Sequence, residues 1–218
     1  MTMNIAIDGP AGAGKSTIAK LVSKKLGFIY VDTGAMYRGI ALYFLKNNID
    51  FLVEENVINN CSNIDIELKY ENKEQMIYLN GENVSKLIRT EEVGNAASKV
   101  AAIKAVREKL LSIQRNIAKE NDVVMDGRDI GTNILPNADV KIYMTASVET
   151  RAKRRFDQLV RTGKETDIEQ IKTDIEQRDY QDMNRAISPL KQADDAYYLD
   201  TSNMTIDEVV NSIIERVK

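Results

Sequence analysis

The hydrophobic and polar positions of this 218-residue chain follow two alternating periods. Short apolar runs predict buried strands at residues 4–8, 28–32, 123–126, 140–145 and 197–200. Helical spacing predicts helices at residues 15–26, 33–47, 52–61, 100–120, 147–162 and 167–183, and a last one from a capping box at Thr205 and Glu208. Strands separated by helices are typical of an α/β fold, here a five-stranded parallel sheet with helices on both faces.

One segment departs from this alternation. Residues 64–70 alternate strictly between apolar and polar side chains, and residues 76–79 form a second run after a polar turn at 71–74. Asn80-Gly81 then predicts a reversal into a short third strand near Val84. We therefore expect a small antiparallel β insert, at about residues 62–90, within a single domain that spans residues 1–218.

The composition narrows the function classes. The chain carries 30 basic and 33 acidic residues, a net charge of −3, so no basic field draws it to nucleic acid or to an anionic membrane. Its one cysteine, Cys61, rules out an internal disulfide and fits a reducing compartment. No window approaches eighteen uncharged apolar residues, and no signal-peptide layout opens the chain. We expect a soluble, cytoplasmic protein.

Histidine is absent from the sequence. The commonest general base is therefore missing, and any chemistry must use carboxylates, lysine, arginine, hydroxyls or a metal ion. Phosphoryl transfer tolerates this well, because its catalysis is mostly positioning and charge stabilisation.

The first candidate site is a phosphate-binding loop. Gly9, Gly14, Lys15 and Ser16 fit the P-loop pattern G-x-x-x-x-G-K-[ST]. Glycines let backbone N–H groups curl around phosphate oxygens, the lysine reaches the β- and γ-phosphates, and the serine hydroxyl can bind Mg²⁺. A glycine-rich turn with an exposed lysine is the alternative, but a strand before the loop and a helix after it favour the P-loop. The predicted ATP-binding residues are Gly9, Pro10, Ala11, Gly12, Ala13, Gly14, Lys15, Ser16 and Thr17.

Two polar segments follow predicted strands, where ligands bind in open α/β sheets. Residues 32–38 (DTGAMYR) begin a helix with a hydroxyl and an arginine, which suits a phosphate site or merely an N-capping threonine beside a solvated arginine. Residues 126–131 (DGRDIG) place Arg128 and Asp129 in a glycine-flanked turn. A purely structural turn would hardly need this pair, so we favour a functional role for it.

Two charged segments lie later in the chain. Arg178, Asp182 and Arg185 share one face of a helix, which fits a binding site and a salt-bridged surface helix equally well. Residues 151–155 (RAKRR) form a basic cluster after a strand. This cluster is a solvated face, a nucleic-acid patch or, beside a P-loop, positive charge that closes over a transferring phosphoryl group.

Together, six segments resemble bacterial cytidylate (CMP) kinases, members of the nucleoside monophosphate kinase family. They are GPAGAGKST at 9–17, DTGAMYR at 32–38, NAAS at 95–98, VRE at 106–108, DGRDIG at 126–131 and RDYQDMNR at 178–185. P-loops are common, but their combination with DGRD and RDxxDxxR is specific, and the match covers nearly the whole chain in order.

The resemblance implies a P-loop nucleoside monophosphate kinase fold. The insert at about 62–90 would be its monophosphate-binding subdomain and about 151–176 its helical lid. The reaction would transfer the γ-phosphoryl group of ATP to CMP or dCMP with Mg²⁺. The protein would be a monomer whose partners are these small molecules, without nucleic acid or membrane.

The resemblance also implies a role for each matching residue. The implied catalytic residues are Lys15, Arg128 and Arg155, and the implied metal ligand is Ser16. The acceptor phosphate would be held by Arg38, Arg128 and Arg185. Cytosine would be bound by Ser98, Arg107 and Asp129, and the sugar by Arg178 and Asp182, with Thr33 nearby.

Two other functions stay open. A P-loop kinase for UMP, AMP, a sugar acid or dephospho-coenzyme A would share the motif, and a hydroxyl acceptor would call for a base such as Asp32. A GTPase-like switch would need a guanine-reading N-K-x-D segment, which the sequence lacks. A monophosphate acceptor needs no base, since its second pKa is about 6. A role for Asp126 in holding Mg²⁺ through water is undecided.

Overall fold

The computed structural model describes residues 2–71, 74–163 and 165–217. The chain divides into two compact units, Met1–Tyr30 with Asn121–Lys218, here called the sheet unit, and Val31–Glu120, here called the insert unit. The predicted turn at 71–74 and the predicted lid at 151–176 each include residues outside the described ranges.

A five-stranded sheet organises the sheet unit. Its strand order is β2-β6-β1-β7-β8, and β1 pairs in parallel with both β6 and β7, as β7 does with β8. The strands are β1 Asn4–Asp8, β2 Ile29–Asp32, β6 Val123–Gly127, β7 Val140–Thr145 and β8 Tyr197–Asp200. The last two residues of β2 already belong to the insert unit. The five strands were predicted from their apolar runs, and the prediction is confirmed.

Helices cover this sheet through an apolar core. Ile5 and Ile7 of β1 pack in one buried cluster with Ile18 and Val22 of α1 (Lys15–Leu26) and with side chains of α8 (Ile206–Ile214). The predicted capping box at Thr205 and Glu208 begins α8. Alternate residues of a strand share one face, which explains why Ile5 and Ile7 enter the same core.

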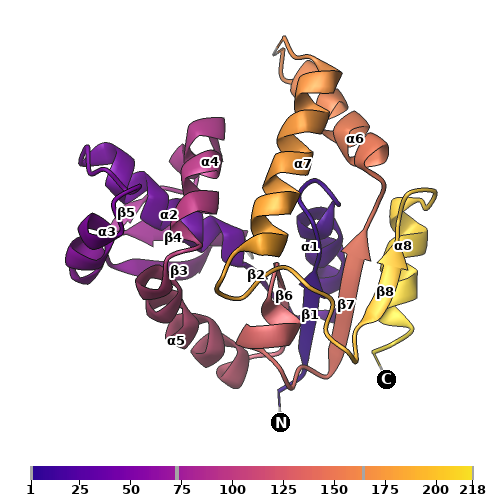
Figure 1. Ribbon diagram of the computed structural model, residues 1–218. Helices are drawn as coiled ribbons and strands as arrows, with labels where there is room; N and C mark the ends of the chain where they lie inside the picture. Colours follow the sequence, from indigo (N-terminus) through magenta and orange to yellow (C-terminus); the bar gives the residue numbers. More distant parts are fainter. Residues whose placement is uncertain (1, 72–73, 164, 218) are drawn as a thin grey trace. The chain divides into compact units, whose positions relative to one another are not determined.

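A helical hairpin completes the sheet unit. Helices α6 (Val148–Arg161) and α7 (Ile168–Asn184) pack against each other, beyond the ends of β1 and β7 that carry the arrowheads in Figure 1. Their contact is a small core of Ala152, Ile171 and Ile175. A five-residue π-helical turn, Ile130–Ile134, follows β6.

The insert unit has its own core around α2 (Thr33–Lys46). Met36, Ile40 and Phe44 of α2 are fully buried among apolar side chains of the other elements. These elements are α3 Glu54–Asn60, a 3₁₀ turn Cys61–Asn63, β3 Ile66–Glu71, β4 Glu74–Leu79, β5 Glu82–Asn83, a 3₁₀ turn Leu87–Arg89, α4 Glu91–Val100 and α5 Lys104–Glu120. Strands β3, β4 and β5 form the predicted antiparallel sheet.

One helix was not predicted. The helix expected at 100–120 is present as α5, which begins at Lys104, but α4, at Glu91–Val100, had not been expected. The Arg107 guanidinium donates to the Ala101 carbonyl oxygen at 3.0 Å, which satisfies a backbone acceptor between the two helices. The predicted strand at 64–70 also begins later, at Ile66, because the Ile64 N–H donates to the Cys61 carbonyl.

Candidate active site

The P-loop connects β1 to α1 in the sheet unit. Gly14 adopts a left-handed conformation (φ 91°) and caps the N-terminus of α1, where helix dipoles favour anions. Gly9, at φ 149°, passes so close to β7 that a Cβ would lie 1.9 Å from the Met144 carbonyl oxygen. Within the described residues, no acceptor takes the backbone N–H groups of residues 12–16. This cradle of free donors fits a polyphosphate.

Lys15 is buried rather than exposed as expected, with 5% of its surface accessible. Its ammonium donates to the Pro10 carbonyl oxygen at 2.7 Å, so the side chain is folded back over the loop. Burial, together with the positive charge of Arg128, lowers the pKa of Lys15 to about 7, against the pull of nearby carboxylates. An incoming phosphate would offer this ammonium the negative partner that it lacks.

Asp126, at the end of β6, lies beside Ser16. The Ser16 hydroxyl donates to one Asp126 oxygen at 2.9 Å, and the Tyr30 hydroxyl donates to the other at 2.8 Å. Hydroxyl and carboxylate oxygens are the ligands that Mg²⁺ prefers, and the ion is usually held by one or two such groups plus phosphates. Among the described residues, no group of three or more histidine, cysteine or acidic side chains could hold a metal ion.

Asp8 fixes the turn after β6. Its two carboxylate oxygens accept the backbone N–H groups of Ile130 (2.8 Å) and Gly131 (2.7 Å). Burial, opposed by these two hydrogen bonds, raises the pKa of Asp8 to about 6. The carboxylate thereby positions the segment that carries Arg128 and Asp129.

Four of the predicted acceptor residues, Arg128, Asp129, Asp182 and Arg185, form one buried network at this edge of the sheet. The Arg128 Nε donates to Asp182 at 2.8 Å, and Arg185 contacts both Asp129 (3.2 Å) and Asp182 (3.9 Å). Asn133 donates to the second oxygen of Asp129 at 3.1 Å. Although burial raises the pKa of Asp182, Arg128 and then Arg185 outweigh it and hold that pKa below its usual range. Asp182 therefore stays ionised, and the two carboxylates orient two guanidinium groups.

The burial of this network bears on the two interpretations of residues 178–185. Asp182 and the Arg185 side chain are buried, so the segment is not a salt-bridged surface helix. The expectation that all three residues share a helical face is wrong for Arg185, because α7 ends at Asn184 and Arg185 is already extended. Arg178 is half-buried and contributes its charge to the field at Asp182.

The basic cluster at 151–155 divides into three environments. Arg151 is buried and pairs with Asp179 of α7 at 2.6 Å. Arg154 donates to the carbonyl oxygens of Ala13 and Thr201, at 3.2 and 2.8 Å. Arg155 contacts Gln158 on its own helix at 3.0 Å. Two of these arginines thus hold the P-loop backbone, and Arg155 lies outside the network.

In the insert unit, Asp32 gathers two arginines. Its carboxylate caps α2 by accepting the Ala35 N–H, and it pairs with Arg38 (3.0 Å) and Arg89 (3.3 Å). Burial raises the pKa of Asp32, but Arg38 and Arg89 outweigh that effect and lower it. Thr33 is buried at the start of the helix. The expected N-capping threonine is wrong, because Asp32 caps the helix and Thr33 is its first residue, and Arg38 is held by Asp32 instead of being solvated.

The other predicted base contacts also lie in the insert unit. Arg107 is buried on α5, with its guanidinium 5.6 Å from the centre of the Tyr37 ring. Ser98 is half-buried on α4. The structure thus brings Lys15, Ser16, Arg128, Asp129, Asp182 and Arg185 into one unit, and Thr33, Arg38, Ser98 and Arg107 into the other.

The sequence of this chain is similar to those of known proteins. The sequence profile described as "Cytidylate kinase" matches residues 5–218. A cytidylate kinase of Lactobacillus johnsonii is 51% identical over 216 residues, which cover 99% of this chain and 94% of the relative. A cytidylate kinase of Caldicellulosiruptor saccharolyticus is 51% identical over 98% of this chain and 94% of the relative.

The chain belongs to the cytidylate kinase family.

Cytidylate kinases are ATP-dependent kinases. We therefore relate the P-loop residues of this family member to phosphoryl transfer from ATP. The solved structure of an uncharacterized protein from Eubacterium ventriosum superposes on 99% of this chain and 98% of its own with a TM-score of 0.53. Its sequence identity is 11%, so this likeness shows a shared fold. No helix in the described part of the chain is long and apolar enough to cross a membrane.

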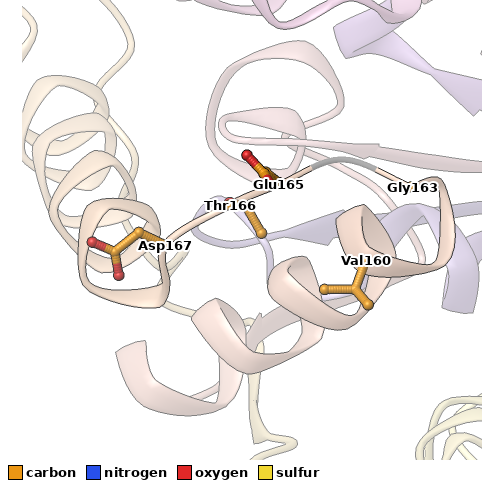
Figure 2. A pocket seen from close by; sticks show the side chains of 5 residues that line it. All are labelled: Val160, Gly163, Glu165, Thr166 and Asp167. Carbon is orange, nitrogen blue, oxygen red and sulfur yellow. The ribbon is translucent and has the colours of Figure 1, made fainter.

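A hollow on the hairpin is lined by none of these P-loop and network residues. A cavity of about 690 Å³ lies between the far ends of α6 and α7 (Figure 2). It is lined by Val160, Gly163, Glu165, Thr166 and Asp167, none of which the motifs had selected. Among the described residues that line it, none has a basic side chain.

Sequence reasoning missed four charged or hydroxyl residues of this family member. They are Asp8, Tyr30, Arg89 and Asp179. Asp8 had a signal, because a carboxylate that ends an apolar strand immediately before a P-loop lies at the ligand edge of the sheet. The other three had none, since their partners are distant in sequence.

Proposed function

We propose that this chain transfers the γ-phosphoryl group of ATP to CMP or dCMP, giving ADP and CDP or dCDP. The observation that carries the proposal is the buried network of Arg128, Asp129, Asp182 and Arg185 in the same unit as the P-loop. Arginines held in fixed orientations by carboxylates suit an anionic acceptor, because guanidinium groups bind phosphate oxygens in pairs.

On the donor side, Lys15 would bind the β- and γ-phosphates in place of the Pro10 carbonyl, and N–H groups of residues 12–16 would surround them. Ser16, with Asp126 beside it, would hold Mg²⁺. When bound, the ion would neutralise charge on the phosphates. Arg155 would add charge from the lid, at about residues 151–176.

On the acceptor side, Arg38, Arg128 and Arg185 would hold the monophosphate, with Arg89 as an additional candidate beside Arg38. Asp129 would accept a hydrogen bond from the cytosine amino group, with Ser98 and Arg107 as further base contacts. Arg178 and Asp182 would bind the sugar, near Thr33.

The insert at about 62–90 would belong to the monophosphate-binding subdomain. Cytoplasmic location and a monomeric state stay predictions from the sequence.

A hydroxyl acceptor is disfavoured by the environment of Asp32. A base that removes a hydroxyl proton works best with a pKa near the operating pH. Arg38 and Arg89 instead lower the pKa of Asp32 against the effect of its burial. A monophosphate needs no base, because it is already mostly ionised at neutral pH.

The test is an ADP-release assay with MgATP and each of CMP, dCMP, UMP and AMP. We expect kcat/KM to be highest for CMP or dCMP, with little ADP released when no acceptor is added. A preference for UMP or AMP would reassign the acceptor. Acceptor-independent hydrolysis as the main activity would overturn the kinase proposal itself.

A further inference from the structure

A buried ion pair contacts the backbone of the P-loop. Arg151, in the first turn of α6, and Asp179, on α7, are 4% and 8% exposed, and their charged groups are 2.6 Å apart. The Arg151 Nε also donates to the Ala146 carbonyl oxygen at 2.9 Å. The pair therefore joins the two helices of the hairpin where both approach the loop.

Both backbone polar groups of Ala11 are hydrogen-bonded to this ion pair. The Ala11 N–H donates to Asp179 Oδ1 at 3.1 Å, and the Ala11 carbonyl oxygen accepts from Arg151 Nη1 at 2.8 Å. A Cβ placed on the next residue, Gly12, would lie 3.4 Å from Arg151 Cβ and 3.7 Å from Ile175 Cδ1. Side chains of α6 and α7 thus fix the peptide at which the phosphate cradle begins.

Stability alone does not explain such a pair. Removing two charges from water costs several kcal/mol per ion, and well-packed apolar residues of similar volume often replace a buried ion pair without loss of stability. Here every hydrogen bond of the pair that leaves the two helices ends on Ala11 or Ala146. The pair has the directionality that an apolar contact lacks.

We propose that Arg151 and Asp179 are positioning residues for ATP. They hold the Ala11 peptide so that the N–H groups of the following residues face the phosphates. This inference rests on the proposed function, since it concerns the donor side of the same site. It also gives the lid a fixed base, because α6 and α7 meet the loop through one shared contact.

Each half of the pair has a separate task. Asp179 orients the Ala11 N–H and would by itself place a negative charge close to the bound phosphates, which is unfavourable. Arg151 neutralises this charge and orients the carbonyl oxygen of the same peptide. Loss of either partner leaves the other buried and unpaired.

The decisive variant replaces both residues, as Arg151→Met with Asp179→Leu. This double variant keeps the volume and removes the hydrogen bonds, so we expect an unfolding midpoint at or above that of the parent. We expect the Kd and the KM for MgATP to rise roughly tenfold or more, equivalent to about 1.4 kcal/mol, while the KM for CMP changes less than about twofold. Parental ATP affinity in the folded double variant would overturn the proposal.

Two single variants keep the test sharp if the double variant does not fold. Asp179→Asn retains an oxygen that can accept the Ala11 N–H, whereas Asp179→Ala does not. We expect ATP binding by Asp179→Asn to lie much closer to that of the parent than binding by Asp179→Ala. Equal effects of the two substitutions would overturn the role of the Ala11 hydrogen bond.

The control is Asp157→Asn, which breaks an exposed ion pair with Lys153 on α6 and should leave ATP affinity unchanged. MgATP affinity is measured by titration calorimetry without any acceptor, so it does not depend on the identity of the acceptor. Failure of the parent to phosphorylate CMP would overturn the proposed function. A folded Arg151→Met, Asp179→Leu double variant that binds MgATP as the parent does would overturn only the positioning role.

Discussion

The charged side chains around the P-loop differ from those on the outer surface of the α6–α7 hairpin in their burial and in the location of their partners. We call them the buried and the surface population. Around the loop, Lys15, Asp8 and Arg151 are buried, and each hydrogen-bonds to backbone of another segment or of the loop itself. On the hairpin surface, Lys153 pairs with Asp157 one turn away on the same helix. The sequence shows equally polar segments in both places. The difference teaches that a charge indicates function here when its partner lies on another segment and water is excluded.

The largest expected effect is on Lys15→Met. We expect kcat to fall by about 10²-fold or more, because the ammonium is directed at the phosphates where charge moves during transfer. The fold should persist, since methionine fills a buried site without leaving a charge there. Steady-state kinetics with CMP and a thermal unfolding curve check both statements. A variant within threefold of the parent would remove the loop from the active site.

Arg185→Ala should have the next largest effect. Arg185 is the shared partner of Asp129 and Asp182, so its loss removes one guanidinium group from two buried carboxylates, and breaking a buried pair typically costs about 3–5 kcal/mol. We also expect kcat/KM for CMP to fall far more than ATP binding does, and Arg178→Ala to share this kinetic effect. Urea unfolding and acceptor kinetics measure the two parts.

The matched control for Arg185 is Lys172→Ala on the outer surface of α7, where Lys172 pairs with Glu169. A surface substitution of this kind usually changes stability by less than about 0.5 kcal/mol. Unchanged kcat/KM for CMP in both arginine variants would return their segment to a structural role and weaken the contrast between the two populations.

Asp8, one of the buried charges near the P-loop, should make the free energy of unfolding depend on pH. Its pKa is about 6 in the folded protein, above the ordinary 3.8, so the folded state holds this proton more tightly than the unfolded chain does. The stability from this group is present at low pH and is lost as the pH rises through about 6. Relative to Asp8→Asn, the parent should lose up to about 3 kcal/mol of unfolding free energy between about pH 4 and pH 7, at about 1.36 kcal/mol per pKa unit.

Urea unfolding of the parent and of Asp8→Asn across this pH range measures the effect, with Asp157→Asn as the exposed control. A stability difference between parent and Asp8→Asn that rises with pH would have the wrong sign. It would show that the hydrogen bonds to Ile130 and Gly131 outweigh the burial of Asp8.

Asp129→Asn should change specificity more than stability. A carboxylate accepts a hydrogen bond from the cytosine amino group, but it faces another acceptor in uracil, whereas an amide can turn its donor toward uracil. We expect the CMP/UMP ratio of kcat/KM to fall roughly tenfold or more, since one such contact is worth about 1.5–3 kcal/mol. If the ratio stays parental, Arg107 and Ser98 become the base-reading residues to test.

The smallest expected effect is on Lys153→Ala. Its ion pair with Asp157 is exposed, and pairs of this kind contribute about 0–1 kcal/mol. Kinetics and unfolding should match the parent within error. A tenfold loss of ATP affinity would show that the surface population also takes part in nucleotide binding, which would break the comparison.

The fold was largely predictable because its signals are local. The apolar runs at 4–8, 140–145 and 197–200 became strands with these bounds. Helix α4 was not predicted, and the start of α5 at Lys104 was not predictable, because residues 100–104 carry no helix breaker and the Arg107 side chain that satisfies Ala101 is a tertiary feature. Periodicity indicates where a helix is favoured, and side-chain capping decides where it ends.

The site divides in the same way. The P-loop was readable from nine consecutive residues, whereas Asp8 meets Ile130 across 122 residues and Ala11 meets Asp179 across 168. One sequence without its fold contains no signal for such pairs. The roles that the family resemblance implies for Ser98, Arg107, Arg155 and Arg178 stay predictions, of which the Arg178→Ala variant tests one.

Gly9 has a consequence for how tolerance to mutation is interpreted. A Cβ there would meet the carbonyl oxygen of Met144 in β7, and Met144 pairs in register with Leu199 of the edge strand β8. A side chain at this position would therefore displace β7 and disturb its ladder to β8. A screen of all substitutions that scores only the amount of folded protein in cells would already reject every replacement of Gly9, before any nucleotide is bound. Intolerance at this glycine would report on assembly of the sheet, and intolerance at Lys15 on phosphate.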